Sequence, residues 1–325
     1  MKVTALAGGV GAARMLSGLA SVVGQESITA IVNTADDMVL HGLHISPDID
    51  TVTYTLAGAG NPGTGWGLAG ETWSVMGALR AFEAAAPGGE GSLTWFNLGD
   101  RDLATHLYRT GRLAAGATLS QVTAEVASRF GVGTRLLPMS DDPVATRVTL
   151  AGDGGAPERE VAFQDYFVGL RHSVPVKSVR FAGAEEARPA PGVVEALAGA
   201  DIVVICPSNP VVSIGPLLAV PGMAEAVAAR RADTVAVSPI IAGKALKGPA
   251  DRMLSELGHR ATVAGVARMW AGLASALVVD EADAGLAGEV EAQGMRAVVA
   301  PSVMSGPAEA ARLAEAVVGA VAGAR

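Results

Sequence analysis

The chain has 325 residues, a net charge of −8 and aromatic side chains at 4% of its positions. These values argue against a surface for nucleic acid or anionic membranes, because such surfaces need basic patches or rings for stacking. The single cysteine, Cys206, excludes an internal disulfide and a multi-cysteine zinc site. Glycines and Arg14 interrupt the N-terminal apolar stretch, and no run of about 18 apolar residues follows, so we expect a cytoplasmic protein without a signal peptide or membrane span.

The first predicted unit is a strand, a glycine-rich turn and a helix. Residues 2–6 form a short apolar run, and apolar residues recur at helical spacing over residues 12–23. Such a turn presents backbone N–H groups and the positive end of a helix to a phosphate, although tight packing is an alternative reason for its glycines. It lacks the Gly-Lys-Ser/Thr of a P-loop, and Arg14 replaces the last glycine of the dinucleotide fingerprint. The candidate phosphate-binding residues are Gly8, Gly9 and Gly11.

Strand and helix signals alternate along most of the remaining chain. Short apolar, β-branched runs predict strands at residues 27–33, 93–97, 201–206, 234–237, 276–279 and 296–299. Helical periodicity predicts helices at residues 71–86, 119–130, 222–231, 282–293 and 307–321. This alternation predicts an α/β fold with a doubly wound, Rossmann-like and mostly parallel sheet.

The middle of the chain has a different pattern. Strand signals with few helices between them occur at residues 135–138, 146–150, 159–163 and 174–181, and residues 152–155 have the composition of a hairpin turn. The length suits about two domains, or one large α/β domain with an insertion. We expect residues 1–100 and 190–325 to form the Rossmann-like core, and residues 100–190 to form an α+β insertion over the sheet.

Polar segments follow several of the predicted strands, including the glycine turn itself. Because ligands of open α/β sheets bind beyond the carboxyl ends of the strands, we expect a site at that edge. The segments are residues 8–11, 33–37, 97–102, 207–210 and 238–244.

Two aspartates near this edge are candidate magnesium ligands. Asp37 follows the second strand, and Asp50 lies in the first turn of a helix that begins at Ser46 and Pro47. The simpler alternative is that acids in a first turn only interact favourably with the helix dipole. Mg²⁺ prefers carboxylates, water and substrate phosphates, and a cation between these acids and the glycine turn would keep them from repelling a bound phosphate.

Three further side chains are candidates for contact with a ligand. His106 and Arg109 can counter anionic charge, although a solvated helix face explains Arg109 as well. Trp66, in a glycine-rich loop, can cover a flat aromatic ligand. No serine or cysteine nucleophile with a histidine base is indicated.

Several ordered motifs resemble the 2-phospho-L-lactate transferase family of coenzyme F420 biosynthesis. They lie at residues 7–14, 33–37, 45–51, 98–106, 139–144, 163–165, 207–215 and 237–243, and the resemblance extends to about Leu277. His41-Gly42 and Gly243-Lys244 look closer to the actinobacterial members of the family than to the archaeal ones.

The resemblance implies a magnesium-dependent reaction with two small-molecule substrates. In that family the ribityl hydroxyl of the 5-deazaflavin Fo attacks a guanosine diphosphate-linked donor, GMP leaves, and the proteins are homodimers. By motif, Asp37 and Asp50 take the catalytic and metal-binding positions, and Asn97 takes a position that contacts the deazaflavin. The other implied substrate-binding residues are Gly8, Gly9, Gly11, Asp100, Arg101, Ser208, Asn209 and Lys244.

Two questions stay open at this stage. A related family of non-catalytic regulators that bind nucleotide-sugars shares the glycine turn and the Asn-Thr-x-Asp-Asp segment, but its members continue with glycine and serine where this chain has residues 38–41. A nicotinamide dehydrogenase is disfavoured because the dinucleotide fingerprint is incomplete. The donor can carry an enolpyruvyl, lactyl or glyceryl group, and the actinobacterial likeness favours enolpyruvyl.

Overall fold

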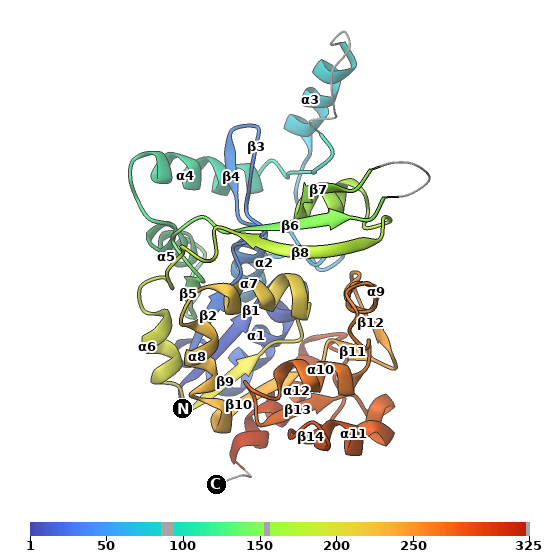
Figure 1. The fold of residues 1–325 in the computed structure, drawn as a ribbon. Helices are drawn as coiled ribbons and strands as arrows, with labels where there is room; N and C mark the ends of the chain where they lie inside the picture. The colour runs from blue at the N-terminus through green and yellow to red at the C-terminus, as the bar shows by residue number, and fades with distance from the viewer. Residues whose placement is uncertain (86–93, 153–156, 323–325) are drawn as a thin grey trace.

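The computed structural model describes residues 1–85, 94–152 and 157–322. Its centre is a seven-stranded sheet in the order β14-β13-β10-β9-β1-β2-β5, and every neighbouring pair in it is parallel (Figure 1). The strands are β1 (Val3–Ala7), β2 (Ile28–Val32), β5 (Arg135–Pro138), β9 (Ile202–Ile205), β10 (Thr234–Val237), β13 (Ala276–Val279) and β14 (Arg296–Val299). This arrangement confirms the predicted α/β, doubly wound sheet.

The chain reverses its direction across the sheet between β1 and β9. It runs from β1 outward to β2 and β5, and later returns to β9 on the other side of β1 before continuing outward to β10, β13 and β14. The carboxyl ends of β1 and β9 therefore flank the switch point at which open α/β sheets bind ligands. The glycine turn that follows β1 lies at this point.

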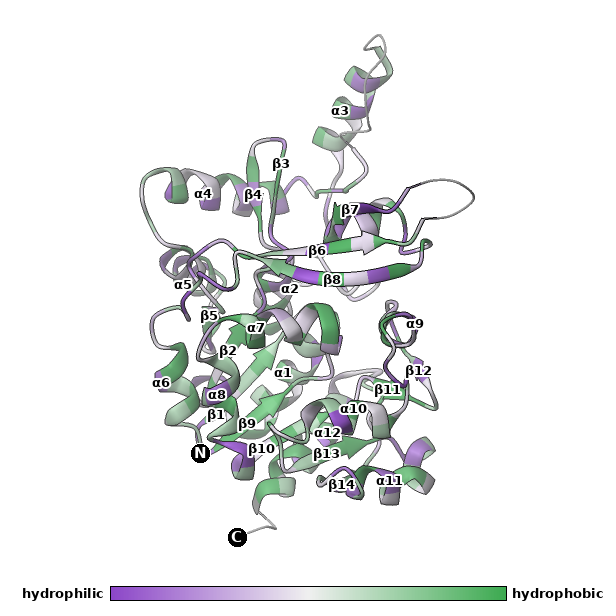
Figure 2. Ribbon diagram, in the orientation of Figure 1, coloured by the Kyte–Doolittle hydropathy of each residue, from purple (hydrophilic) through white to green (hydrophobic). Residues whose placement is uncertain are grey.

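Both faces of the sheet are covered by helices, because alternate strand residues point to opposite faces and nearly all of them are apolar. Leu6 and Val203 pack in one core cluster with α6 (Val193–Ala198), α7 (Gly215–Ala219), α8 (Met223–Ala228) and α10 (Val263–Trp270). Ala5 and Val204 pack in the other with α1 (Gly9–Val23), α2 (Pro47–Leu56) and α12 (Pro307–Ala322). Figure 2 shows the hydrophobic colouring concentrated on the central strands and on the helices beside them.

A second layer lies beyond the carboxyl ends of the central strands (Figure 1). It contains an antiparallel sheet in the order β7-β6-β8, a hairpin and two helices. Its members are β3 (Met38–Leu40), β4 (Leu43–Ile45), β6 (Ala145–Leu150), β7 (Arg159–Ala162), β8 (Val176–Ala182), α3 (Ser74–Ala85) and α4 (Asp102–Ala114). The remaining α-helices and strands are α5 (Leu119–Arg129), α9 (Ala250–Glu256), α11 (Ala287–Glu291) and the short strands β11 (Ile240–Ile241) and β12 (Lys244–Ala245).

Some predicted elements differ from those in the structure. Residues 94–97 form turns and bends and not a strand, because Trp95 and Phe96 point into a cavity and have no partner strand, whatever their β propensity. Residues 135–138, which we grouped with the middle segment, form β5 and pair with β2. The predicted helix at 282–293 is split into a 3₁₀ turn, Glu281–Leu286, and α11. Most of the predicted hairpin turn at 152–155, and Leu93, lie outside the described residues.

Over residues 1–85, 94–152 and 157–322, no helix combines the length and the apolar character that crossing a membrane requires.

Candidate active site

A cavity of about 900 Å³ lies at the switch point, between the central sheet and the layer beyond it. Residues of the glycine turn, the first turn of α2 and the segments around residues 66, 96, 165, 209, 247 and 304 line it. Most of the predicted site residues are among them: Gly8, Gly9, Gly11, Asp50, Asn97, Ser208 and Asn209. Asp37, Asp100, Arg101 and Lys244 are not.

The three glycines of the turn are required for different structural reasons. Gly8 precedes α1 in extended conformation, and a Cβ there would lie 2.9 Å from the Cβ of Ser213. A Cβ on Gly11 would lie 2.7 Å from the carbonyl oxygen of Pro207. Gly9 has φ of +73° and nothing within 4 Å of its Cβ position, so the chain needs glycine there for its backbone conformation while the space beside it is open. Close packing therefore explains Gly8 and Gly11, and Gly9 leaves room for a ligand beside the turn.

Ser208 and Asn209 brace the glycine turn and the loop after β9. Ser208 Oγ donates a hydrogen bond to the carbonyl oxygen of Gly8 at 2.8 Å. Asn209 Oδ1 accepts from the backbone N–H of Val211 at 2.9 Å. Both side chains thus hold the cavity wall in shape as well as lining it.

A group of carboxylates lies beside the turn, in which Asp36 is buried and Asp48 is half-buried. Asn33 Nδ2 donates to Asp36 Oδ2 and to Asp48 Oδ2, each at 3.0 Å, and Asp48 also accepts from the backbone N–H of Gly9. Burial, with the neighbouring charge of Asp48, holds the pKa of Asp36 well above its usual range, and burial raises the pKa of Asp48 to about 6. Asp48 lies in the first turn of α2, as the helix-dipole alternative supposes, but burial and the neighbouring charges make the ionised forms of Asp36 and Asp48 unfavourable.

Asp37 belongs to the same group of charges. Its Oδ2 accepts a hydrogen bond from Ser46 Oγ at 2.6 Å, and its pKa is raised mainly by burial, with the charges of Asp50 and Asp48 adding to the effect. The Oδ1 atoms of Asp36 and Asp37 are buried without a hydrogen-bond partner among the described residues. Asp37 lines a second cavity of about 1290 Å³, and Asp36 lines both cavities.

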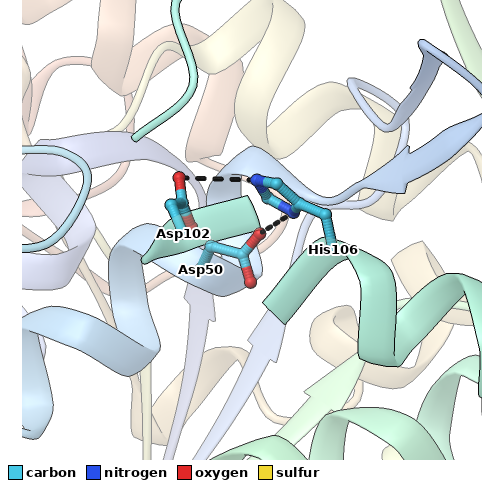
Figure 3. Close-up of side chains that lie close together, drawn as sticks. All are labelled: Asp50, Asp102 and His106. Atoms are coloured by element: carbon cyan, nitrogen blue, oxygen red, sulfur yellow. Dashed lines mark ion pairs between the residues drawn. The ribbon is translucent and has the colours of Figure 1, made fainter. Parts of the chain in front are cut away.

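Asp50 is paired within the protein. Its carboxylate accepts two hydrogen bonds from the guanidinium of Arg109, and one of them, from Nη1 to Oδ2, measures 3.1 Å. Arg109 is only 1% exposed, and Asp50 is 4% exposed. His106 lies between two carboxylates, with Nδ1 at 3.7 Å from Asp50 Oδ2 and Nε2 at 3.4 Å from Asp102 Oδ2 (Figure 3). The predicted countercharges His106 and Arg109 therefore face carboxylates of the protein itself.

Asp102 and Tyr54 are site residues that the sequence did not indicate. Tyr54 OH donates to Asp102 Oδ1 at 2.6 Å, and both line the cavity. Burial alone would raise the pKa of Asp102, but the hydrogen bond and charge of His106, with the Tyr54 hydroxyl, lower it. One ligand atom each from Asp50, Asp102 and His106 lie within 4.8 Å of one another, so this group can also hold a metal ion. The i, i+4 spacing of Asp102 and His106 on α4 was the available signal.

Asp100 and Arg101 organise the segment before α3. Asp100 accepts hydrogen bonds from Thr72 Oγ1 at 2.6 Å and from the backbone N–H groups of Ser74 and Val75, and these bonds lower its pKa to about 2. Arg101 Nη1 donates to the carbonyl oxygen of Ala69 at 2.7 Å. The structure does not bring either residue to the cavity wall.

Aromatic rings form much of the apolar wall. Trp66, Trp95, Phe96, Phe163 and Phe167 all line the cavity, and Phe163 and Phe167 stack at 5.4 Å between centroids with 16° between ring planes. Trp66 is 44% exposed, so its ring is open to a ligand. Such a wall suits a flat heteroaromatic ring.

Cys206 is not part of the reactive chemistry. It is 1% exposed beneath the turn, and burial raises the pKa of its thiol to about 12. The thiol therefore stays protonated near neutral pH, as expected for a structural cysteine.

Comparisons with known proteins identify the family of the chain. The family model described as 2-phospho-L-lactate transferase CofD matches residues 3–303, beyond the limit near Leu277 that the motifs indicated. The phosphoenolpyruvate transferase of Streptomyces griseus is 47% identical over 94% of this chain and 93% of that protein. The phosphoenolpyruvate transferase of Mycolicibacterium smegmatis is 41% identical over 97% of both chains.

Solved structures agree on the fold. Two crystal structures of one Bacillus halodurans protein, described in one case as a upf0052 family member, match with TM-scores of 0.61 and 0.60. The first covers 98% of this chain and 99% of that one, at 17% identity, and the second covers 98% of both at 19%. The family match and the relatives together show that the chain belongs to the 2-phospho-L-lactate transferase CofD family and is a transferase.

Proposed function

We propose that the chain transfers a phosphoenolpyruvyl group from a guanosine diphosphate-linked donor to the ribityl hydroxyl of Fo, with release of GMP, in coenzyme F420 biosynthesis. The names of the Streptomyces and Mycolicibacterium relatives support the transferred group. The observation that carries the proposal is that carboxylates share a cavity with the glycine turn: Asp48 and Asp36 line it, and Asp36 has a buried oxygen without a hydrogen-bond partner among the described residues. A 2-phospho-L-lactyl group, as in the family description, is the alternative.

The cavity has room and chemistry for both substrates. The N-terminus of α1 and the open side of Gly9 suit the diphosphate of the donor, because backbone N–H groups and the helix dipole attract anions. The rings of Trp66, Trp95 and Phe96, with the amide of Asn97, suit the deazaflavin. This division places the acceptor hydroxyl and the donor phosphate near the carboxylates.

The carboxylates fit a magnesium ion. Asp37 and Asp50 are the proposed ligands, with Asp36 and Asp48 in the same group. Hard oxygen donors are what Mg²⁺ prefers, and the unpartnered oxygens of Asp36 and Asp37 lack only a cation or a proton. When bound, the ion would neutralise the negative charge of the transferring phosphate.

The residues of the chain then position and deprotonate the acceptor. The ribityl oxygen forms a bond to the phosphorus that carries the enolpyruvyl group, and the bond from that phosphorus to the bridging oxygen of GMP breaks. The hydroxyl proton passes to a carboxylate of this group, in which burial raises the pKa of Asp36, Asp37 and Asp48. The ion pair with Arg109 fixes the orientation of Asp50.

Two further properties belong to the proposal: a homodimeric assembly, from the family resemblance, and a cytoplasmic location, from the sequence pattern of the N-terminus and of the apolar runs. The competing function, a regulator that binds nucleotide-sugars without turnover, shares the fold. Against it stands the 41–47% identity to named transferases over nearly the whole chain.

The test is GMP release with Fo, Mg²⁺ and each of the enolpyruvyl, lactyl and glyceryl donors. We expect Fo-dependent GMP release with all active donors and a preference for enolpyruvyl of roughly 10- to 200-fold at most, because these groups differ by only a few atoms. Faster use of the lactyl donor would overturn the donor assignment and leave the transferase intact. Saturable nucleotide-sugar binding with no turnover of any donor would support the regulator.

A further inference from the structure

The segment between β12 and α9 faces the glycine turn across the cavity. Leu246, Lys247, Gly248 and Pro249 all line the cavity, whereas Lys244, three residues earlier in β12, does not. The backbone turns at Gly248, which has φ of +70°. This turn brings Lys247, and not the lysine indicated by sequence, to the cavity.

The ammonium group of Lys247 lies beside Gly65, which also neighbours the side chain of Val10 in the glycine turn. A Cβ built on Gly65 would lie 3.5 Å from Lys247 Nζ and 3.0 Å from Val10 Cγ1. Gly65 therefore fits between the two, and its φ of +79° also requires glycine. Three loops thus meet here: the glycine turn, the loop that contains Gly65, and the segment that contains Lys247.

Lys247 has the charge that the cavity needs at this place. The charged lining residues include the acids Asp36, Asp48, Asp50 and Asp102. Among the described lining residues, the side chains with a permanent positive charge are those of Arg14 and Lys247. Arg14 Nη1 already donates a hydrogen bond to the carbonyl oxygen of Met304 at 3.0 Å. Among residues 1–85, 94–152 and 157–322, Lys247 has neither an ion pair nor a side-chain hydrogen bond. Its charge is therefore available to an anionic ligand.

We propose that Lys247 binds the diphosphate of the nucleotide donor and holds it against the N-terminus of α1. This inference rests on the proposed function. An anion at this end of α1 lies beside the carboxyl group of Asp48 and needs a positive charge nearby, which Lys247 supplies from the wall of the same cavity. Lys247 is a positioning residue for the donor and makes no contact with the acceptor ring.

The test measures two affinities, for GDP by calorimetry and for Fo by its absorption spectrum, in the wild type, in the three variants described next and in Lys244→Ala. Lys247→Ala should weaken GDP binding by about 10- to 100-fold, the usual cost of losing a charged contact, and leave Fo binding within about twofold. Lys247→Arg should restore most of the GDP affinity. Lys177→Ala, which removes one positive charge from β8 where Lys177 pairs with Glu158, is the control and should bind both ligands like the wild type.

The outcomes separate this inference from the proposed function. If Lys247→Ala binds GDP as tightly as the wild type does, the role of Lys247 is overturned and the proposed transferase function is not. Loss of GDP binding in Lys244→Ala and not in Lys247→Ala would overturn it in favour of the lysine indicated by sequence. A wild-type protein that binds neither GDP nor Fo would overturn both.

Discussion

The acids of the site differ in what else they do for the protein. Asp37 is held by the single hydroxyl of Ser46, whereas Asp50 neutralises a guanidinium that is almost completely buried. The pairing with Arg109 makes Asp37 the cleaner position for a test of catalysis.

Asp37→Asn should lower kcat by on the order of 10³-fold or more, because a ligand for the charge-neutralising ion is lost. Its melting temperature should stay near that of the wild type. Asp50→Asn should lose activity and also melt earlier, since breaking a buried ion pair costs about 3–5 kcal/mol. Steady-state kinetics with Fo and thermal melts of both variants decide the matter. Activity of Asp37→Asn within tenfold of the wild type would contradict its role.

The carboxylate group also predicts a dependence of stability on pH. The folded-state pKa of Asp48 is raised from 3.8 to about 6 by burial, so between these values the folded protein holds more protons than the unfolded chain. The contribution of this carboxyl to stability is therefore fully present below about pH 4 and is lost as the pH rises through 6. Replacement of Asp48 by asparagine, whose amide stays neutral, removes this loss of stability at neutral pH.

Asp48→Asn should be more stable than the wild type at pH 7 by about 1–3 kcal/mol when divalent cations are chelated, and no more stable at pH 4. Urea unfolding at the two pH values, each against the wild type, measures the difference. An equal effect at both pH values would mean that the ionised form of Asp48 is not strained.

At the scale of elements, the contact between α1 and α12 holds the glycine turn in place. A Cβ on Gly18 would lie 2.2 Å from the carbonyl oxygen of Ala310 in α12, so the two helices touch at backbone distance. Gly18→Ala should destabilise the protein by about 1–3 kcal/mol, because α1 must move away from α12. In chemical denaturation, we expect the midpoint of unfolding to fall while the dependence of the unfolding free energy on denaturant concentration stays the same.

The matched control is Gly111→Ala in α4, where nothing lies within 4 Å of the Cβ position. The same substitution there should be neutral or stabilise by about 0.5–1 kcal/mol, since alanine favours a helix more than glycine does. Equal effects at the two positions would show that the close approach of α12 is not what requires Gly18.

Elements with a clear periodic pattern of apolar residues were predicted well from the sequence. The apolar spacing of residues 12–23 and 307–321 corresponds to α1 and α12, and the buried runs of β9, β10 and β13 were identified directly. Residues 94–97 were not, because aromatic side chains have the same β propensity whether they face a partner strand or a ligand cavity. The pairing of β5 with β2 depends on contacts across more than a hundred residues, which local pattern does not encode.

At the scale of the whole molecule, the site lies where two layers meet. The sequence could predict at which edge of the sheet the site lies, because strand ends and glycine-rich turns are local signals. It could not predict the partners of the acids, because Asp50 meets Arg109 and Tyr54 meets Asp102 at separations of 59 and 48 residues. The sequence also did not indicate Lys247, because its place on the cavity wall depends on the backbone turn at Gly248.

The central claim is that this cavity joins a donor phosphorus to the hydroxyl of Fo. The most direct measurement is mass spectrometry of a reaction of the wild-type protein with Fo, the guanylylated enolpyruvyl donor and Mg²⁺, with GMP quantified in the same sample. The account predicts one enolpyruvyl phosphodiester of Fo for each GMP released, and neither product above background with Asp37→Asn. GMP released without modification of Fo, or no GMP at all, would contradict it.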